Sequence, residues 1–529
     1  QAFGTAGWRD GAAKLRDGAG KLVVCRGVST IGSQAPAGGS PSAVAPGSAE
    51  GPIDLLTDVV AHAPASCTYA EARWVENTEE LLAVVSGRPE DPELERSRGV
   101  GVRVRARSGW GFSATDDVSK AGLRRALERA VAIAEAQPSR PSPPLAPIEP
   151  AQGHWSGPCR LDPFALSLES KLELLTDADA QMRTDPRIVR TEAECRSAVT
   201  RTALVSSEGV ACSQTVTQCG GGIRAFAVGD GEAQVRSYPS AHGGSPASAG
   251  WEQVLELDLS AHAPRVADEA LALLTAPPCP SGQTTVILHD EQLALQVHES
   301  IGHALELDRI LLGEASYAGT SWVQPEDLGK LRYGSSLLNV TADATLPGGL
   351  GTFMWDDEGV AGRRTPLIEG GVLVAALSDR SSAAAIGLPA SAGCARADGF
   401  ARQPIVRMTN VSLEPGDAGT LEDLIADTQD GLYLEGNRSW SIDDRRLHFQ
   451  FATEVGREIR RGRLGRLYRN ASYAGVTPEF WRSLDGVCSA LAWRVWGLLN
   501  CGKGEPGQIM HVSHGAAPGR FRGVEVGVA

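Results

Sequence analysis

Apolar residues recur with two different periods along the chain, and the change of period predicts where helices and strands lie. A spacing of three and four residues is typical of an amphipathic helix, whereas strict alternation is typical of a half-buried strand. Within residues 53–278, the helical pattern covers 119–136, 166–182 and 259–274, and the alternating pattern covers 69–75, 82–85, 99–112 and 187–228. This region is therefore predicted to be an N-terminal α/β domain with a mixed sheet and helices.

Residues 279–529 carry mostly strand and turn patterns. A short apolar strand is expected at 284–288, soon after the paired prolines Pro277 and Pro278 that mark the predicted domain boundary. Glycine-rich hairpin turns are expected at 348–351, 369–371 and 461–462. The predicted fold class is α+β, in which the α/β domain is followed by a strand-rich C-terminal domain that carries the chemically informative helix described below.

Two segments lack both periods. Residues 1–52 are rich in Ala, Pro, Gly and Ser, a composition typical of a flexible N-terminal extension. Residues 137–150 are rich in proline and predict a stiff surface loop inside the first domain. No repeat of fixed length is visible in the 529 residues.

The net charge limits the expected binding partners, and the cysteines indicate the expected cellular compartment. The formal net charge is −14, and an acidic chain has no general attraction for nucleic acid or for anionic membrane. No apolar run is long enough to span a bilayer, and we expect no secretory signal at the N-terminus. The ten scattered cysteines are then expected to be reduced thiols of a cytoplasmic protein.

Residues 291–308 contain the strongest candidate chemistry. The segment reads as an apolar helix in which His298, Glu299 and His303 are the main polar side chains. Neutral histidine is a common zinc ligand, and a neighbouring glutamate can accept a proton from water in hydrolysis. The usual spacing in zinc peptidases places the second histidine four residues after the first. Here the spacing is five, which on a regular helix separates the two side chains by about 140°.

A π-type turn would realign the two imidazoles, and Gly302 would ease that distortion. A helix with two hydrogen-bonded core histidines is the competing interpretation. A catalytic zinc also needs a third protein ligand. The candidates from sequence are Glu306, Asp308, His448, Cys488, Cys501, His511 and His514.

From about residue 53 onward the sequence resembles the TldD/PmbA peptidase family, and in particular its catalytic, TldD-like branch. The stretches that carry the resemblance occur in the family's order and are 69–73, 97–103, 110–116, 298–308, 356–360, 407–416 and 500–503. The resemblance implies that His298, His303 and Cys501 bind zinc and that Glu299 is the general base. The match is loose at residues 395–402, which leaves substrate preference open.

The resemblance further implies a zinc-dependent peptidase for unfolded or extended peptides, with a possible role in the maturation of peptide precursors. It implies a dimer, either a homodimer or a heterodimer with a PmbA/TldE-like subunit. The alternative is a peptide-binding or regulatory subunit that does not cut. The complete metal motif favours the enzyme, because TldE-like subunits generally lack it.

Several other features have plainer interpretations. The arginine-rich segment 457–469 is expected to be a solvated hairpin rather than a nucleic-acid site. The acidic run 356–358 is expected to be a hydrogen-bonded turn rather than a second metal site. His511 and His514 are expected to be surface-loop residues, and Lys503 a solvated side chain unless it supports the Cys501 thiolate.

Overall fold

The protein is described here from a computed structural model, which defines residues 14–16, 22–24, 51–107, 109–137, 144–313 and 319–528. Residues 1–51 and 52–529 form two separate units. In the first unit the described strands are β1 (Lys14–Arg16) and β2 (Leu22–Val24), which pair antiparallel. The prediction of a flexible extension falls mainly on residues outside the described ones.

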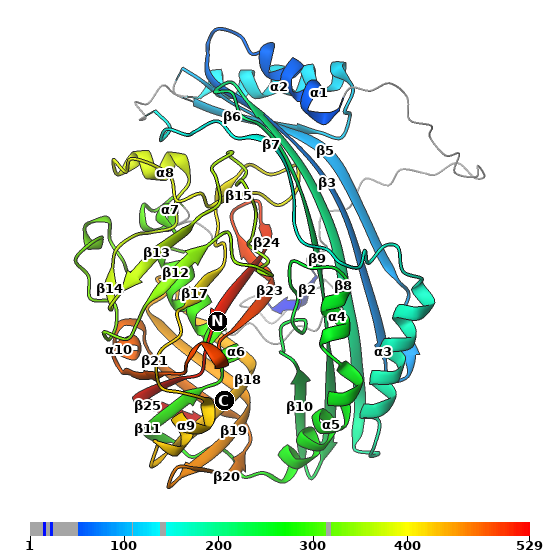
Figure 1. Cartoon of the computed structure of the whole chain (residues 1–529), viewed down its shortest axis with the longest axis vertical. Helices are drawn as coiled ribbons and strands as arrows, with labels where there is room; N and C mark the ends of the chain where they lie inside the picture. The colour runs from blue at the N-terminus through cyan, green and yellow to red at the C-terminus, as the bar shows by residue number, and fades with distance from the viewer. Residues whose placement is uncertain are drawn as a thin grey trace. The chain divides into compact units, whose positions relative to one another are not determined.

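A long, curved sheet dominates the first half of the second unit (Figure 1), and its strands pair antiparallel except for β7, which pairs parallel with β9. Its strands follow the order β10-β9-β8-β3-β5-β6, with short β4 paired to β3 and β7 paired to β9. The strands are β3 (Cys67–Val85), β4 (Arg88–Pro89), β5 (Glu93–Ala106), β6 (Gly109–Thr115), β7 (Gln152–Ser156), β8 (Ile188–Ser206), β9 (Ala211–Gly229) and β10 (Glu232–Tyr238).

Strand β3 is one continuous element, although the sequence pattern predicts two separate strands at 69–75 and 82–85. The residues between them, Glu76 to Leu81, are only partly buried and mostly polar. They therefore show no apolar alternation, yet their backbone pairs with both β5 and β8 along the whole segment. Continuous pairing, and not side-chain pattern, holds the centre of this strand in the sheet.

Helices cover one face of the sheet at its two ends (Figure 1). At one end, helices α1 and α2 pack on β3 and β5 around Ala72 and Val102. At the other end, helices α3 and α5 pack on the far ends of β3, β8 and β9 around Leu82 and Ile223. The helices are α1 (Pro52–Ala61), α2 (Lys120–Ala136), α3 (Leu168–Met182), α4 (Glu252–Glu256) and α5 (Leu259–Thr275). The helices predicted at 119–136, 166–182 and 259–274 are confirmed.

The C-terminal half is built around a sheet that closes on itself. Strand β11 pairs parallel with β18 and antiparallel with β25, which joins the two ends of the row β11-β18-β19-β21-β25. Apolar side chains such as Phe451 and Phe521 on its strands belong to the buried core of this half. The strands are β11 (Gly282–Leu288), β18 (Asp430–Ile442), β19 (His448–Arg460), β20 (Arg463–Tyr468), β21 (Ala471–Val476), β22 (Leu484–Val487) and β25 (Gly519–Val528).

Smaller sheets and short helices surround this barrel. The four-stranded sheet has the order β14-β13-β12-β17, and β15–β16 and β23–β24 form two-stranded sheets. The strands are β12 (Val340–Asp343), β13 (Arg364–Glu369), β14 (Val372–Leu373), β15 (Ala395–Arg396), β16 (Ile405–Val406), β17 (Val411–Leu413), β23 (Arg494–Lys503) and β24 (Gln508–Ala516). The helices are α6 (Asp290–Val297), α7 (Leu307–Ile310), α8 (Arg380–Ala385), α9 (Leu421–Ala426) and α10 (Thr477–Arg482). The fold is thus α+β, as predicted.

The hairpins predicted at 369–371 and 461–462 are confirmed, and the second places the arginine-rich segment on the mostly exposed β19–β20 hairpin. The hairpin predicted at 348–351 is wrong. These glycines lie in the long loop between β12 and β13, where Gly349 and Gly351 pack closely against Asn410 and Thr409. The segment contains tight turns, in which the N–H of Gly349 bonds the carbonyl of Leu346 and that of Thr352 bonds the carbonyl of Gly349, but these turns do not directly join two strands. The missing side chains of Gly349 and Gly351 also allow close backbone approach.

Charged side chains join the long sheet to the C-terminal half. Glu71 and Arg73 point away from the helices, because successive side chains on a strand alternate faces. Arg103 bonds Glu71 at 2.7 Å and Glu358 at 2.8 Å, and all three are buried. Asp356 accepts backbone N–H bonds from Glu358, Val360 and Ala395, which confirms that the acidic run is a hydrogen-bonded turn.

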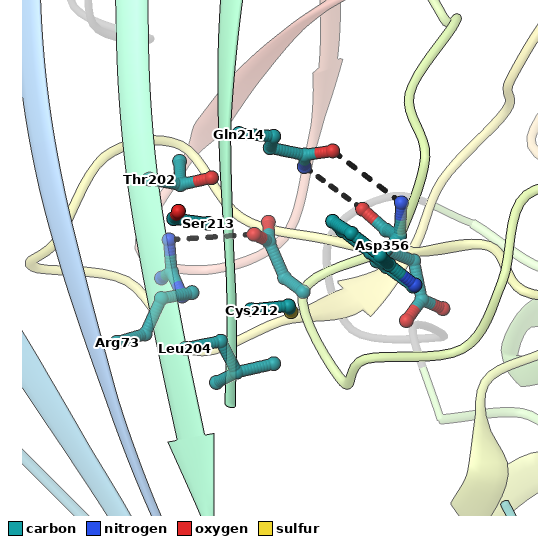
Figure 2. Close-up of a pocket in the computed structure, with 9 residues that line it drawn as sticks. Arg73, Thr202, Leu204, Cys212, Ser213, Gln214 and Asp356 are labelled. Carbon is teal, nitrogen blue, oxygen red and sulfur yellow. Dashed lines mark hydrogen bonds and ion pairs between the residues drawn. The ribbon is translucent and has the colours of Figure 1, made fainter. Parts of the chain in front are cut away.

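A small cavity of about 10 Å³ lies at the same boundary, with room for about one water molecule. Figure 2 shows Arg73, Thr202 and Gln214 reaching from the sheet toward the loop that carries Asp356. The Gln214 amide accepts from the backbone N–H of Met354 and donates to the carbonyl of Trp355. The interface between the long sheet and the C-terminal half is therefore polar at this point, and its hydrogen bonds position the C-terminal half on the sheet.

In the part of the chain that the structure defines, no helix combines the length and apolar character needed to cross a bilayer.

Candidate metal centre

The helix that begins at Asp290 changes its winding at the predicted motif. Residues 290–297 are α-helical, His298–Gly302 form a π turn, and His303–Leu305 form a 3₁₀ turn. The backbone N–H of His303 bonds to the carbonyl of His298, five residues earlier. The predicted π turn is confirmed, and it brings the two imidazole centroids to 4.7 Å from each other.

Gly302 is required here for space and not for an unusual backbone angle. Its φ lies in the right-handed helical region. A Cβ at this position would come within 2.1 Å of the sulfur of Met408, which is fully buried. The missing side chain therefore lets the π turn pack directly against the segment 407–410.

Cys501 lies on β23 and reaches the same point from a distant part of the chain. Its sulfur is 3.6 Å from Nε2 of His303. One ligand atom from each of His298, His303 and Cys501 falls within 4.8 Å of the others, and all three residues are buried. The structure thus brings the three predicted ligands together.

His514 fixes the orientation and tautomer of His298. Nδ1 of His514 is 2.7 Å from the carbonyl oxygen of Val411, which can only accept, so this nitrogen donates. Burial, with the nearby His298, holds the pKa of His514 well below its usual value and keeps it neutral. Its Nε2 then accepts from Nδ1 of His298 at 2.7 Å, which leaves Nε2 of His298 free as a ligand.

The prediction that His514 is a surface-loop residue is therefore wrong. The side chain is fully buried on β24, on the same strand face as Val512 and Ala516. His511, three residues earlier, points to the opposite face and bonds Gln218 of the long sheet.

Glu306 fixes His303 in the same way. Its Oε2 accepts from Nδ1 of His303 at 3.0 Å, which leaves Nε2 of His303 directed at the cluster. Burial raises the pKa of Glu306, but Lys503 and His303 outweigh it and hold the pKa well below the usual value. Glu306 thus orients a candidate ligand.

Lys503 is buried, so the prediction of a solvated side chain is wrong. Its ammonium bonds both oxygens of Asp308, at 2.7 and 2.8 Å, and the carbonyl of Val406. It lies 3.4 Å from Glu306. The cation with the largest effect on the Cys501 thiol is Arg407.

Arg407 is fully buried and donates hydrogen bonds to the carbonyls of Cys501 and Gln508. Burial raises the pKa of the Cys501 thiol, but Arg407 and His303 outweigh it and lower the pKa to about 7. A thiol in this environment is readily available as the thiolate, which is the form that binds a metal.

The carboxylate of Glu299 lies next to the cluster and is held at both oxygens. Oε1 accepts from the indole N–H of Trp440 at 2.9 Å, and Oε2 accepts from Arg446 at 2.6 Å. Burial raises the pKa of Glu299, but Arg446 and the two histidines outweigh it and lower the pKa, so the group is ionised. Trp440 and Arg446 come from the end of β18 and the turn that follows it.

Four of the ligand candidates from sequence lie elsewhere, and one of them is His511, which bonds Gln218. Asp308 pairs with Lys503, His448 is exposed on β19, and Cys488 is buried away from the cluster beside Gly416. Sequence reasoning missed Trp440, Arg446 and Arg407, because no spacing links them to the histidine pair. The alternation of apolar residues along β24 could have predicted that His514 is buried, since Met510, Val512 and Ala516 lie on the same face of the strand.

The donor set fits a zinc ion with one open position. Two imidazoles and one thiolate are common zinc ligands, and catalytic zinc sites use three protein ligands. With ordinary Zn–N and Zn–S bond lengths, a tetrahedral ion sets such a nitrogen and sulfur about 3.6 Å apart. The Sγ of Cys501 and Nε2 of His303 are 3.6 Å apart.

A buried cluster of two histidines and a cysteine beside an ionised glutamate has the composition of the sites found in metal-dependent hydrolases. Three family models match the chain: the PmbA/TldA metallopeptidase domain 1 at residues 70–134, the central domain at 161–275 and the C-terminal domain at 281–527. The chain belongs to the TldD/PmbA family of metallopeptidases.

Individual relatives agree with this assignment. A metalloprotease of Methanocaldococcus jannaschii is 29% identical over 79% of this chain and 89% of its own length. A metalloprotease TldD homolog of Haemophilus influenzae is 24% identical over 89% of this chain and 95% of its own length. The crystal structure of TldE from Thermococcus kodakarensis shares the fold, with a TM-score of 0.69 at 14% identity over 89% of this chain and 99% of that one.

Proposed function

We propose that the protein is a zinc-dependent peptidase that hydrolyses unfolded or extended peptides. The observation that carries the proposal is the convergence of His298, His303 and Cys501 beside the ionised carboxylate of Glu299. When bound, zinc would polarise the scissile carbonyl and make water acidic enough to attack it near neutral pH.

The protein's own residues supply positioning and proton transfer. His514 and Glu306 hold the two histidine ligands in one tautomer each. Glu299 accepts a proton from the attacking water and passes it to the leaving amine. Trp440 and Arg446 keep the Glu299 carboxylate ionised and fix its direction.

The edge of β23 that is not paired with β24 supports a peptide substrate. Among the described residues, β23 pairs only with β24, and Cys501 lies on β23 beside an irregularity in that pairing. An extended peptide can add to such an edge through main-chain hydrogen bonds. A peptide paired in this way would pass close to the sulfur of Cys501.

The nine cysteines in the described residues are free thiols, which supports the proposal that the protein works in a reducing compartment such as the cytoplasm. The alternative, a binding subunit that does not cut, gives no reason for an ionised glutamate beside a complete ligand set. The homodimer or heterodimer with a TldE-like subunit remains part of the proposal, and light scattering of the purified chain tests the homodimer.

The proposal is tested by digesting a mixed peptide library with zinc-loaded protein and mapping the new termini by mass spectrometry. Glu299→Gln, with its zinc content measured, serves as the blank. We expect cleavage by the wild-type protein, no cleavage after chelation and none by Glu299→Gln with full zinc. Equal cleavage by zinc-loaded Glu299→Gln would exclude Glu299 as the base, and no cleavage by any sample would favour the binding subunit.

A further inference from the structure

His242 extends toward the catalytic carboxylate from the central region of the chain, in the loop that follows β10. Hydrogen bonds hold this loop in one conformation. The Ser240 hydroxyl donates to the carbonyl of Gly244 and accepts from the N–H of His242, and Arg224 donates to the carbonyl of Ala241. Gly243 and Gly244 both have positive φ, 76° and 75°, which favours glycine.

The loop lies against both elements that form the site. The His242 ring packs edge-on against Trp440, with centroids 5.4 Å apart. Trp440 in turn donates to Glu299. A side chain at Gly243 would contact Leu499 on β23 at 3.5 Å, two residues before Cys501. The loop therefore contacts both the tryptophan that bonds the Glu299 carboxylate and the strand that carries Cys501.

Nε2 of His242 is buried and has no hydrogen-bond partner. Leaving such an atom unpaired costs about 1–3 kcal/mol, so a partner that arrives with the substrate would account for it. Arg446 also has a buried unpartnered nitrogen, Nε. That atom belongs to the guanidinium group whose terminal nitrogen already bonds Glu299, whereas Nε2 is at the tip of the His242 side chain.

We propose that His242 is a catalytic residue whose Nε2–H donates a hydrogen bond to the oxygen of the scissile carbonyl. The inference rests on the proposed peptidase function and deepens it. Water adds to the carbonyl carbon, the carbon–nitrogen bond breaks, and the proton passes through Glu299 to the amine, while His242 transfers no proton. It stabilises the negative charge that develops on the oxygen.

Electrostatics of the loop agree with a neutral donor. Burial, followed by Arg224 and His298, lowers the pKa of His242 to about 4. A neutral imidazole can act as an electrophile toward a carbonyl oxygen. His242 does not belong to the group of side chains that could hold a metal, so the donor role does not compete with metal binding.

The test compares His242→Phe, which keeps a ring against Trp440, with His242→Gln, which restores a side-chain N–H. His242→Leu removes both the nitrogen atoms and the ring. It provides a second variant without the N–H donor, so the test can still be made if His242→Phe does not fold. His262→Phe is the matched control, because His262 lies away from the site. Its ring stacks on that of Tyr238, with centroids 3.9 Å apart. Each zinc-loaded variant is assayed for kcat, KM and zinc content on a peptide that the wild type cleaves.

We expect His242→Phe to lower kcat about 10²-fold, the usual effect of removing one oxyanion donor. KM and zinc content should stay within a few-fold, and His242→Gln should recover part of the loss. Binding of a phosphinic peptide, which resembles the tetrahedral state, should weaken by a similar factor in calorimetry. His262→Phe should behave as the wild type.

Wild-type kcat in His242→Phe or His242→Leu would overturn the inference and leave the peptidase function standing. A fall in kcat accompanied by an equal loss of zinc would also overturn it, because the role would then be structural. A wild-type protein that cleaves no peptide would overturn both the proposed function and this inference.

Discussion

His514 offers a quantitative test of how the metal site is built. Its imidazole connects Nδ1 of His298 to the carbonyl of Val411 through two hydrogen bonds of 2.7 Å. Replacement by Leu removes the acceptor for His298 and leaves a buried N–H unpaired, at a cost of about 1–3 kcal/mol. His298 also loses the constraint that directs its Nε2 to the metal. Partners of this kind typically contribute 10- to 100-fold in metal affinity.

We therefore expect His514→Leu to bind zinc about 10- to 100-fold more weakly, which corresponds to about 1.4–2.7 kcal/mol. His514→Gln should lie closer to the wild type, because its amide can both donate and accept. The assay is competition for zinc with a chromophoric chelator at fixed pH, after thermal melting of the metal-free proteins has shown equal folding. Wild-type zinc affinity in folded His514→Leu would refute the argument that His514 fixes His298.

Three further predictions concern residues around the cluster. Arg446→Met should lower kcat roughly 10- to 100-fold with unchanged zinc content. The reason is that Glu299 loses its 2.6 Å hydrogen-bond partner, and general-base catalysis contributes about 10²–10⁴-fold to the rate. The control is Arg445→Met, which changes an exposed neighbour and should leave kcat unchanged; equal kcat in the two variants would contradict the prediction. Lys503→Met should destabilise the fold by about 3–5 kcal/mol, because the buried ammonium neutralises Asp308. Denaturant unfolding measures this against the exposed control Lys330→Met, and equal stability would count against a structural ion pair. Gly302→Ala should lower the free energy of unfolding by about 1–3 kcal/mol, because the new methyl group crowds Met408, and it should weaken zinc binding. An unchanged melting temperature and zinc affinity would show that the π turn tolerates a side chain.

Local patterns in the sequence predict most elements of the long sheet and its helices. Leu123, Leu127 and Ala134 on α2 are all buried, as their helical spacing indicates. The same patterns do not show that β3 is continuous or that β11 closes a barrel by pairing with β25. Those features depend on backbone pairing between segments far apart in the chain, which leaves no local periodic signal.

The candidate site divides in the same way. The spacing from His298 to His303 predicts the π turn, because two imidazoles five residues apart share a face only if the helix is underwound. The third candidate ligand, Cys501, lies 198 residues beyond His303, and only the family resemblance selects it from the sequence. The surrounding groups, such as Arg446, Arg407 and His242, come from separate loops and strands, and their roles depend on three-dimensional contacts that sequence spacing does not encode.

X-ray absorption of the zinc-loaded protein tests the central claim most directly, namely that His298, His303 and Cys501 together bind one catalytic zinc. We predict one sulfur neighbour at about 2.3 Å and nitrogen or oxygen neighbours at about 2.0–2.1 Å. Cys501→Ser should lose the sulfur signal. A zinc spectrum without sulfur in the wild-type protein, or one unchanged in Cys501→Ser, would contradict the account.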